Sequence, residues 1–278
     1  MKRQIREWIE NLAKAVLERS RLTMILATLL AEQRNRAIRH RVEANLLASG
    51  EYGDEIQQGP FRGLSYPPNE DWAAARFQKV IGFYEIELQA PIEQLIAEKR
   101  PYTDIIIAGA AEGYYTVGLG HHFPQAAIHS FEIQAHRREF LERFAKLNQL
   151  NDRVTNYGYC DPQALNQLKI GKRPLVVCDV EGYEEILMDP KAVTWLTRAD
   201  IILELHDNFV PGIQTLIRSR FGDSHEIERF SENGVPYNQF PLLNKLLMSE
   251  ILALTASERV CIQNWFIMHT KNAENTTT

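Results

Sequence analysis

A buried strand, a glycine turn and a helix follow one another between residues 104 and 122, and this succession most constrains the fold. The segment 104–108 is nearly all apolar, and Gly109 and Gly113 then bracket a short turn. Such a turn lets the backbone approach a ligand closely and aims helix N–H groups at it. A second apolar segment ends in Glu132, whose carboxylate can accept hydrogen bonds from two ribose hydroxyls. The pattern therefore predicts a nucleotide-like cofactor.

Composition fits a soluble globular protein, with 45% apolar and 24% charged residues among 278. The net charge of −5 gives no reason to expect nucleic acid as a partner, although residues 1–41 carry an excess of positive charge. The three cysteines are widely spaced and form no CxxC pair, which favours a reducing cytoplasm. The apolar run 22–31 is shorter than the about 20 residues that span a bilayer, so we expect no membrane segment.

The N-terminal part predicts helices, because apolar residues recur at three- and four-residue steps within 3–47. One interpretation is a helical hairpin with a solvated basic face. The other is a dimer arm, or a lid over an anionic substrate. Residues 48–70 are rich in glycine and proline and predict a loop, and a helix is expected near 72–98. We therefore divide the chain into a helical appendage with its loop, 1–70, and a main domain, 71–278.

From residue 104 onward, apolar strands alternate with helical patterns. The expected strands are 105–108, 127–132, 154–157, 175–179 and 201–206, followed by 226–230 and 264–270, with a helix near 241–254 between the last two. Continuous apolar strands separated by helices are typical of a parallel sheet that is covered on both faces. The sequence thus predicts an α/β, doubly wound fold with an N-terminal helical appendage.

The turn also limits the kind of cofactor. The dinucleotide fingerprint GxGxxG has a second glycine that admits a pyrophosphate, and Ala111 stands there in this chain. This substitution disfavours NAD and FAD. A cofactor without phosphates, such as S-adenosylmethionine, needs only one close approach of the backbone.

Over roughly residues 80–208, the chain resembles the FkbM-type family of S-adenosylmethionine-dependent methyltransferases. The resemblance is carried by Tyr84-Glu85, Gly109-Ala-Ala-Glu-Gly-Tyr-Tyr-Thr116, Phe131-Glu132, Asp179-Val-Glu-Gly-Tyr-Glu184 and Ile202-Leu-Glu-Leu-His206. It implies a Rossmann-like methyltransferase sheet of seven strands, with the last strand antiparallel. It also implies an enzyme that uses S-adenosylmethionine, most simply for O-methylation of a small hydroxylated or glycosyl substrate.

The resemblance also implies the positions of the site residues. The cofactor would be bound by Glu85, Gly109, Ala111, Gly113, Glu132 and Asp161. Of these, Glu132 would take the ribose. Asp161 follows the third strand, where adenine is usually held, and it can equally cap the next helix.

The catalytic candidates are Asp179, Glu181 and His206. Asp179 and His206 end two neighbouring strands, so their side chains can converge on one pocket. We expect His206 to act as the base and Asp179 to position cofactor or acceptor, because a histidine titrates near neutral pH. The alternative is that Asp179 and Glu181 only hold the turn and that His206 is structural. Asp179, Glu204 and His206 carry metal-ligand atoms, but their spacing is no metal signature, so we predict no metal.

A second function class stays open. Ile107 stands where methyltransferases often have Asp or Asn, two residues before the first glycine of the turn. Because of this departure, the alternative stays open that the protein is non-catalytic, retains the cofactor fold and acts through its N-terminal helical arm. In either case the N-terminal helices are candidates for a homodimer contact.

Overall fold

The computed structural model describes residues 14, 21–68, 75–255 and 262–271. These residues form two compact units. Of the described residues, 14, 21–53 and 236–255 belong to one unit, and 54–68, 75–235 and 262–271 belong to the other. The predicted division at residue 70 differs from this one, because residues 54–68 belong to the sheet-containing unit. There, Phe61 and Tyr66 are fully buried, against Tyr114 and Phe144 respectively.

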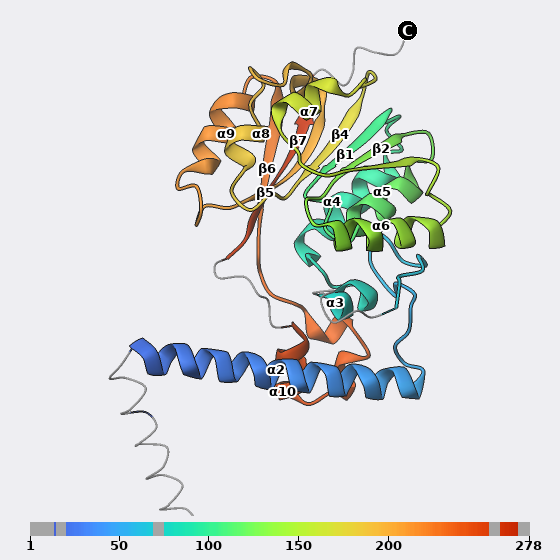
Figure 1. Ribbon diagram of the computed structural model, residues 1–278, viewed down its shortest axis with the longest axis vertical. Coiled ribbons are helices and arrows are strands. Elements are labelled where there is room, and N and C mark those ends of the chain that lie inside the picture. The colour runs from blue at the N-terminus through green and yellow to red at the C-terminus, as the bar shows by residue number, and fades with distance from the viewer. Residues whose placement is uncertain (1–13, 15–20, 69–74, 256–261, 272–278) are drawn as a thin grey trace, which may run out of the picture. The chain divides into compact units, whose positions relative to one another are not determined.

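The larger unit is built on a seven-stranded sheet (Figure 1). Its strands are β1 Asp104–Ala108, β2 Ala127–Phe131, β3 Val154–Tyr157, β4 Pro174–Cys178, β5 Asp200–Leu205, β6 His225–Ser231 and β7 Asn264–Thr270. The spatial order is β3-β2-β1-β4-β5-β7-β6. The first five strands are parallel, whereas β7 runs antiparallel to both β5 and β6. The predicted doubly wound, mostly parallel sheet is thus confirmed.

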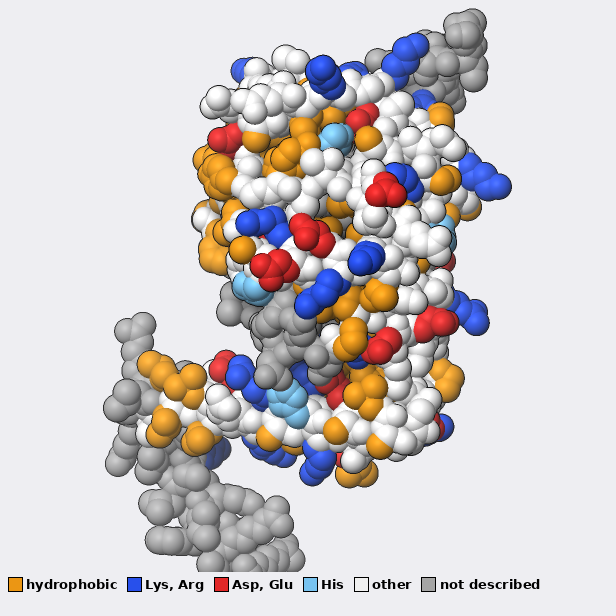
Figure 2. Space-filling model, turned by 45° about the vertical axis from the view of Figure 1, so that its right-hand side comes forward, with side chains coloured by type: hydrophobic (Ala, Val, Ile, Leu, Met, Phe, Trp, Pro, Cys, Tyr) orange, Lys and Arg blue, Asp and Glu red, His pale blue; other side chains and the backbone are white. Residues whose placement is uncertain are grey.

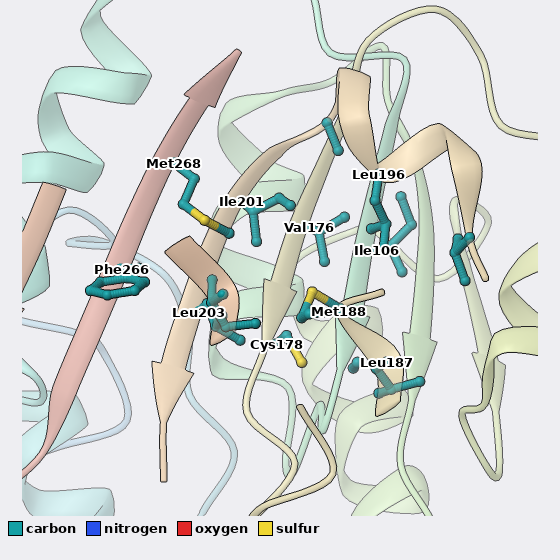
Figure 3. Close-up of a cluster of buried hydrophobic side chains, with 14 of the residues drawn as sticks. Ile106, Val176, Cys178, Leu187, Met188, Leu196, Ile201, Leu203, Phe266 and Met268 are labelled. Carbon is teal, nitrogen blue, oxygen red and sulfur yellow. The ribbon is translucent and has the colours of Figure 1, made fainter. Parts of the chain in front are cut away.

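Helices cover both faces of the sheet (Figure 1). They are α4 Ile86–Ala97, α5 Tyr114–His122, α6 Ala135–Leu147, α7 Pro162–Gln167, α8 Glu184–Leu187, the 3₁₀ helix η1 Thr194–Arg198, and α9 Ile213–Phe221. The short helix α3 Arg76–Ile81 lies beyond the ends of the strands (Figure 1). Alternate strand residues pack against α7, α8, η1 and α9 in one continuous core, shown in Figure 3. The strands read as unbroken apolar runs because both faces are buried.

The helix predicted near 72–98 is broken into α3 and α4 within the described residues. Gly82 ends α3 with φ 94°, and Glu85 begins α4 with φ 43°. Gly82 is thus the left-handed C-cap of α3, and a Cβ there would lie 2.3 Å from the carbonyl oxygen of Gln58, so only glycine fits at this position. The prediction of one continuous helix is therefore wrong at this point.

The smaller unit contains the long helix α2 Arg21–Ser49 and the short helix α10 Met248–Thr255, with 3₁₀ turns η2 Tyr237–Gln239 and η3 Leu243–Lys245. An ion pair joins Arg41 to Glu250 at 3.2 Å, and a second joins Lys245 to Glu51. The predicted helix at 241–254 is thus replaced by a 3₁₀ turn and a shorter α-helix. The predicted apolar stripe of residues 5–16 lies outside the described residues. No helix among the described residues is long and apolar enough to cross a membrane.

Candidate active site at the carboxyl ends of the strands

The glycine turn lies at the carboxyl end of β1, between β2 and β4. The N–H groups of Gly109 and Ala110 both donate to the carbonyl of Phe131, at 3.0 and 2.8 Å. Gly109 has φ 81°, and Gly113 has φ 98° at the start of α5. A Cβ at Gly113 would lie 2.7 Å from Leu141, so both glycines are required by close packing as well as by conformation.

Glu132 lies at the end of β2 and contacts the turn directly. One carboxylate oxygen accepts from the N–H of Ala111 at 3.0 Å, and the other accepts from the N–H of Gln134 at 2.8 Å. Ala111 itself has φ 46°, in the left-handed region. Two carboxylate oxygens offer about four lone pairs, so Glu132 keeps acceptor capacity for two hydroxyl groups. The structure brings together Gly109, Ala111 and Glu132 as the sequence predicts.

Asp161 has a defined structural role. It is the N-cap of α7, and its side chain accepts from the N–H of Ala164 at 2.7 Å. The capping interpretation is therefore correct, and one carboxylate oxygen is left for a ligand.

The catalytic candidates converge at the ends of β4 and β5. Nε2 of His206 lies 3.6 Å from Asp179 and 3.3 Å from Glu181, and its Nδ1 lies 2.6 Å from Glu184. Glu184 also accepts from the N–H of Val180 at 3.2 Å, and it is fully buried. The carboxylate thereby fixes the orientation of the imidazole ring. Sequence reasoning noted Glu184 in the motif but gave it no role.

Burial and neighbouring charges shift the pKa values of Asp179 and His206. Burial raises the pKa of the Asp179 carboxyl well above its ordinary value, and the negative charges of Glu204 and Glu85 raise this pKa further. Burial also opposes the charged form of His206. The hydrogen bond to Glu184 and the neighbouring carboxylates outweigh that effect and raise the pKa of His206 to about 9. His206 must therefore lose a proton before Nε2 can accept another.

Glu181 reaches the group through an unusual backbone conformation. It has φ 53°, and Gly182 follows with φ 100°. A left-handed conformation is uncommon for glutamate and has a cost in free energy. The turn places the carboxylate of Glu181 beside His206 while its side chain stays 75% exposed. A Cβ at Gly182 would lie 2.8 Å from Cβ of Phe209, so the turn also packs against the segment after β5.

Two further acids at this edge are held by side chains from elsewhere in the fold. Glu85 is buried and accepts from the hydroxyl of Tyr115. Glu204 is buried and accepts from Gln263 and, at 3.3 Å, from Trp265. Gln263 and Trp265 were not predicted as site residues. They reach Glu204 because β7 runs antiparallel to β5, so the start of β7 lies beside the end of β5.

A buried ion pair supports the glycine turn from the other side. Glu112 pairs with Lys79 and accepts from the hydroxyl of Tyr66 at 3.0 Å. Although burial opposes the ionised form, Lys79 holds the pKa of Glu112 below its ordinary value. Sequence reasoning missed this role, because the acid inside the turn gives no sign of whether it faces the ligand or the protein.

The known proteins that are similar to this chain share little sequence with it. No family model and no curated protein matches the chain. Among solved structures, a putative O-methyltransferase from Klebsiella pneumoniae is 15% identical, with 84% of this chain and 89% of that chain covered and a TM-score of 0.44. The O-methyltransferase TomG of tomaymycin synthesis from Streptomyces achromogenes, in complex with S-adenosylmethionine, is 16% identical, with 72% and 90% covered and a TM-score of 0.43.

A third similar structure is geranyl diphosphate C-methyltransferase from Streptomyces coelicolor A3(2), in complex with Mg²⁺, geranyl-S-thiolodiphosphate and S-adenosyl-L-homocysteine. It is 11% identical, with 79% of this chain and 86% of that chain covered and a TM-score of 0.43. The sheet has the Rossmann-like methyltransferase architecture. That assignment is established by the strand order and by the antiparallel β7.

Proposed function

We propose that this protein is an S-adenosylmethionine-dependent methyltransferase. The glycine turn lies where the chain reverses its direction of winding, since β2 and β4 flank β1 on opposite sides. In open parallel sheets, ligands bind outside the carboxyl ends of the strands at such a switch point. The turn, Glu132 and Asp161 then suit the amino-acid end, the ribose and the adenine of the cofactor respectively.

The charge of the site is the observation that supports this cofactor most. Acidic side chains lie at the carboxyl ends of four of the five parallel strands, at the same edge of the sheet. They are Glu132 after β2, Asp161 after β3, Asp179 and Glu181 after β4, and Glu204 near the end of β5. S-adenosylmethionine carries a positive sulfonium and a positive amino group, whereas a dinucleotide carries two negative phosphates. Opposite charges attract strongly in a partly desolvated site, so this edge favours the sulfonium cofactor.

We further propose methyl transfer to the oxygen of a small hydroxylated or glycosyl acceptor in the cytoplasm. Asp179, Glu181 and His206 form the group that faces the acceptor, with Glu85 nearby on the cofactor side. His206 is the candidate base, because Glu184 holds Nδ1 and leaves Nε2 directed at the site. The methyl carbon leaves the sulfonium sulfur and bonds to the acceptor oxygen, whose proton passes to the base. Alignment of the three reacting atoms supplies much of the rate enhancement.

Calorimetry with S-adenosylmethionine, S-adenosylhomocysteine and NAD tests the cofactor. We expect the first two ligands to bind and NAD not to bind. Glu132→Gln keeps the shape of the side chain and should weaken S-adenosylhomocysteine binding by about 1–3 kcal/mol, the range for a hydrogen bond to a charged group. The exposed Glu139 on α6 gives a matched control, Glu139→Gln, that should bind normally. Binding of NAD without any signal from S-adenosylhomocysteine would falsify the proposal.

A screen of hydroxylated metabolites and glycosides with methyl-labelled S-adenosylmethionine would then identify the acceptor. Once it is known, His206→Gln should lower kcat by about 10²–10⁴-fold, because general bases contribute that much to a rate. Cofactor affinity should change little. Wild-type turnover in this variant would make His206 a structural residue.

A further inference from the structure

The group at the ends of β4 and β5 has the composition of a metal site. One oxygen of Asp179, one oxygen of Glu181 and Nε2 of His206 all lie within 4.8 Å of one another. Ligand atoms bound at 2.0–2.2 Å to one ion are separated by roughly 4.4 Å at most, so only small side-chain rotations are needed. The carboxylate of Glu181 is exposed and free to make them.

The hydrogen bonds select these three residues from the six ionisable groups nearby. Glu85 is bonded by Tyr115, and Glu204 is bonded by Gln263 and Trp265. By contrast, Oδ1 of Asp179 is buried and makes no hydrogen bond among the described residues. Nε2 of His206 lies 3.6 Å from Asp179 and 3.3 Å from Glu181, and the side chain is only 3% exposed.

The contact of Nδ1 of His206 also fits a metal-binding histidine. Nδ1 of His206 lies 2.6 Å from the buried carboxylate of Glu184. Histidines that bind metals through one nitrogen almost always donate their other N–H to a carboxylate, a carbonyl or water. Once His206 has lost its second proton, the donation from Nδ1 fixes the tautomer, so that Nε2 carries the lone pair that a metal needs.

We propose that Asp179, Glu181 and His206 bind a divalent transition-metal ion, of which Mn²⁺ fits the donor set best. Two carboxylates suit Mg²⁺, Ca²⁺ and Mn²⁺, whereas an imidazole suits the later transition metals, and Mn²⁺ accepts both. Three protein ligands leave positions open for an oxygen of the acceptor. Glu184 is a positioning residue, because it acts on the metal through His206.

The inference rests on the proposed function, and it makes His206 a metal ligand instead of a base. A bound cation lowers the pKa of a coordinated hydroxyl, so the acceptor's proton can pass to solvent water without a protein base. The resulting oxygen anion bonds to the methyl carbon as the carbon–sulfur bond breaks. Nε2 cannot be both ligand and base, so metal binding decides between the two roles.

Mn²⁺ binding to the metal-free full-length protein, followed by electron paramagnetic resonance of the free ion, tests this proposal without any acceptor. The wild type should bind one Mn²⁺. Asp179→Asn, Glu181→Gln and His206→Gln should each weaken binding at least tenfold. Glu184→Gln should weaken it by about 10–100-fold, as is typical for partners of a metal ligand. The exposed neighbour Glu185 provides the control, Glu185→Gln, which should bind like the wild type.

Competition with Zn²⁺ and Ca²⁺ tests the donor set, and S-adenosylhomocysteine binding separates a failure of the metal site from a failure of the proposed function. Zn²⁺ should displace Mn²⁺, and equimolar Ca²⁺ should not, because Ca²⁺ is bound by oxygen ligands. The proposed site is wrong if the His206→Gln variant binds Mn²⁺ as tightly as the wild type. It is also wrong if equimolar Ca²⁺ abolishes Mn²⁺ binding. Far-UV circular dichroism and thermal unfolding of every variant show that each is folded, and S-adenosylhomocysteine binding is measured beside them. A protein that binds S-adenosylhomocysteine but no Mn²⁺ contradicts this inference alone. One that binds Mn²⁺ but neither form of the cofactor contradicts the proposed function.

Discussion

Gly109 and Asp179 are in backbone contact, although 70 residues separate them in the sequence. A Cβ added at Gly109 would lie 1.7 Å from the carbonyl oxygen of Asp179, and the N–H of Asp179 donates to the carbonyl of Ala108 at 3.0 Å. The turn proposed to bind the cofactor and the strand end that carries the catalytic candidates are therefore built as one piece. A substitution in the glycine turn should therefore alter the strand end, and a substitution at the strand end should alter the turn.

Gly109→Ala should disrupt this contact. The clash is with backbone and the conformation is left-handed, so we expect a loss of about 2–4 kcal/mol in the free energy of unfolding. S-adenosylhomocysteine affinity should fall at least tenfold. Gly158, after β3, has no atom within 4 Å of an added Cβ, and Gly158→Ala is the control. Urea unfolding and calorimetry measure both effects, and equal behaviour of the two variants would contradict the prediction.

Lys79→Met should destabilise the protein by about 3–5 kcal/mol, because it leaves the buried carboxylate of Glu112 without its cation. Adding Glu112→Gln should restore part of this loss, since the unpaired charge is then removed. The exposed Lys146 gives the control, Lys146→Met, with little change expected. A double-mutant cycle from urea unfolding gives the coupling energy. A coupling near zero would show that the pair does not stabilise the fold.

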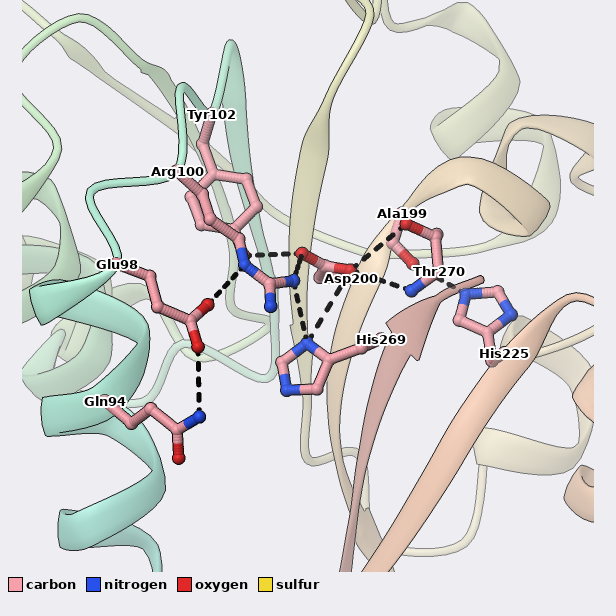
Figure 4. Close-up of polar contacts among 9 residues, drawn as sticks. All are labelled: Gln94, Glu98, Arg100, Tyr102, Ala199, Asp200, His225, His269 and Thr270. Carbon is pink, nitrogen blue, oxygen red and sulfur yellow. Dashed lines mark hydrogen bonds and ion pairs between the residues drawn. The ribbon is translucent and has the colours of Figure 1, made fainter. Parts of the chain in front are cut away.

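Asp200 should make stability depend on acid pH through the network in Figure 4. Burial alone would raise its pKa, but contacts with His269, Tyr102, Thr270 and Arg100 hold the pKa well below the ordinary 3.8. A group with a lowered pKa stabilises the fold above its unfolded value and loses that contribution as the pH falls.

Asp200→Asn should therefore be less stable than the wild type at pH 6–7, and the gap should narrow below about pH 4. Thermal unfolding across this range measures the gap, with the exposed Asp223→Asn as control. A gap that stays constant down to pH 2 would mean that Asp200 is not ionised in the folded protein.

Helix α2 should mediate the proposed homodimer contact. Apolar side chains gather toward its N-terminal end (Figure 2), where Ile25, Leu26, Leu29 and Leu30 are all more than half exposed. Leu26→Glu combined with Leu29→Glu should shift the molecular mass in solution from dimer to monomer, because charge opposes burial of this face. Leu147 on α6 is 50% exposed, and Leu147→Glu is the control. A wild type that is monomeric by light scattering would end the proposal.

Much of the sheet could be predicted because its strands are continuous apolar runs. The closing strand 264–270 was predicted with the bounds that the structure shows. The break at Gly82 was missed, because a lone glycine within an apolar helical pattern can either end a helix or be tolerated inside it, and the backbone of Gln58 that packs against Gly82 is distant in the sequence. The grouping of residues 236–257 with α2 likewise depends on contacts between distant segments.

The site was predictable to the extent that strand ends converge. Asp179, Glu181 and His206 were expected together and lie together. The sequence did not identify the cation ligands: it predicted no metal, and the acid that it considered beside Asp179 and His206 was Glu204 and not Glu181. Glu204 is excluded by its bonds to Gln263 and Trp265, and these follow only from the antiparallel pairing of β7.

The position of β7 has a consequence for how copies of this chain can assemble. β7 lies between β5 and β6, and among the described strands β6 pairs with β7 alone. Until residues 264–270 insert, β5 presents an open edge of unpaired backbone groups, and such an edge accepts any matching strand. The same strand from another copy matches exactly in sequence. Exchange of β7 between two chains would then fill both sheets and reproduce every backbone hydrogen bond, at the cost of tying the two molecules together.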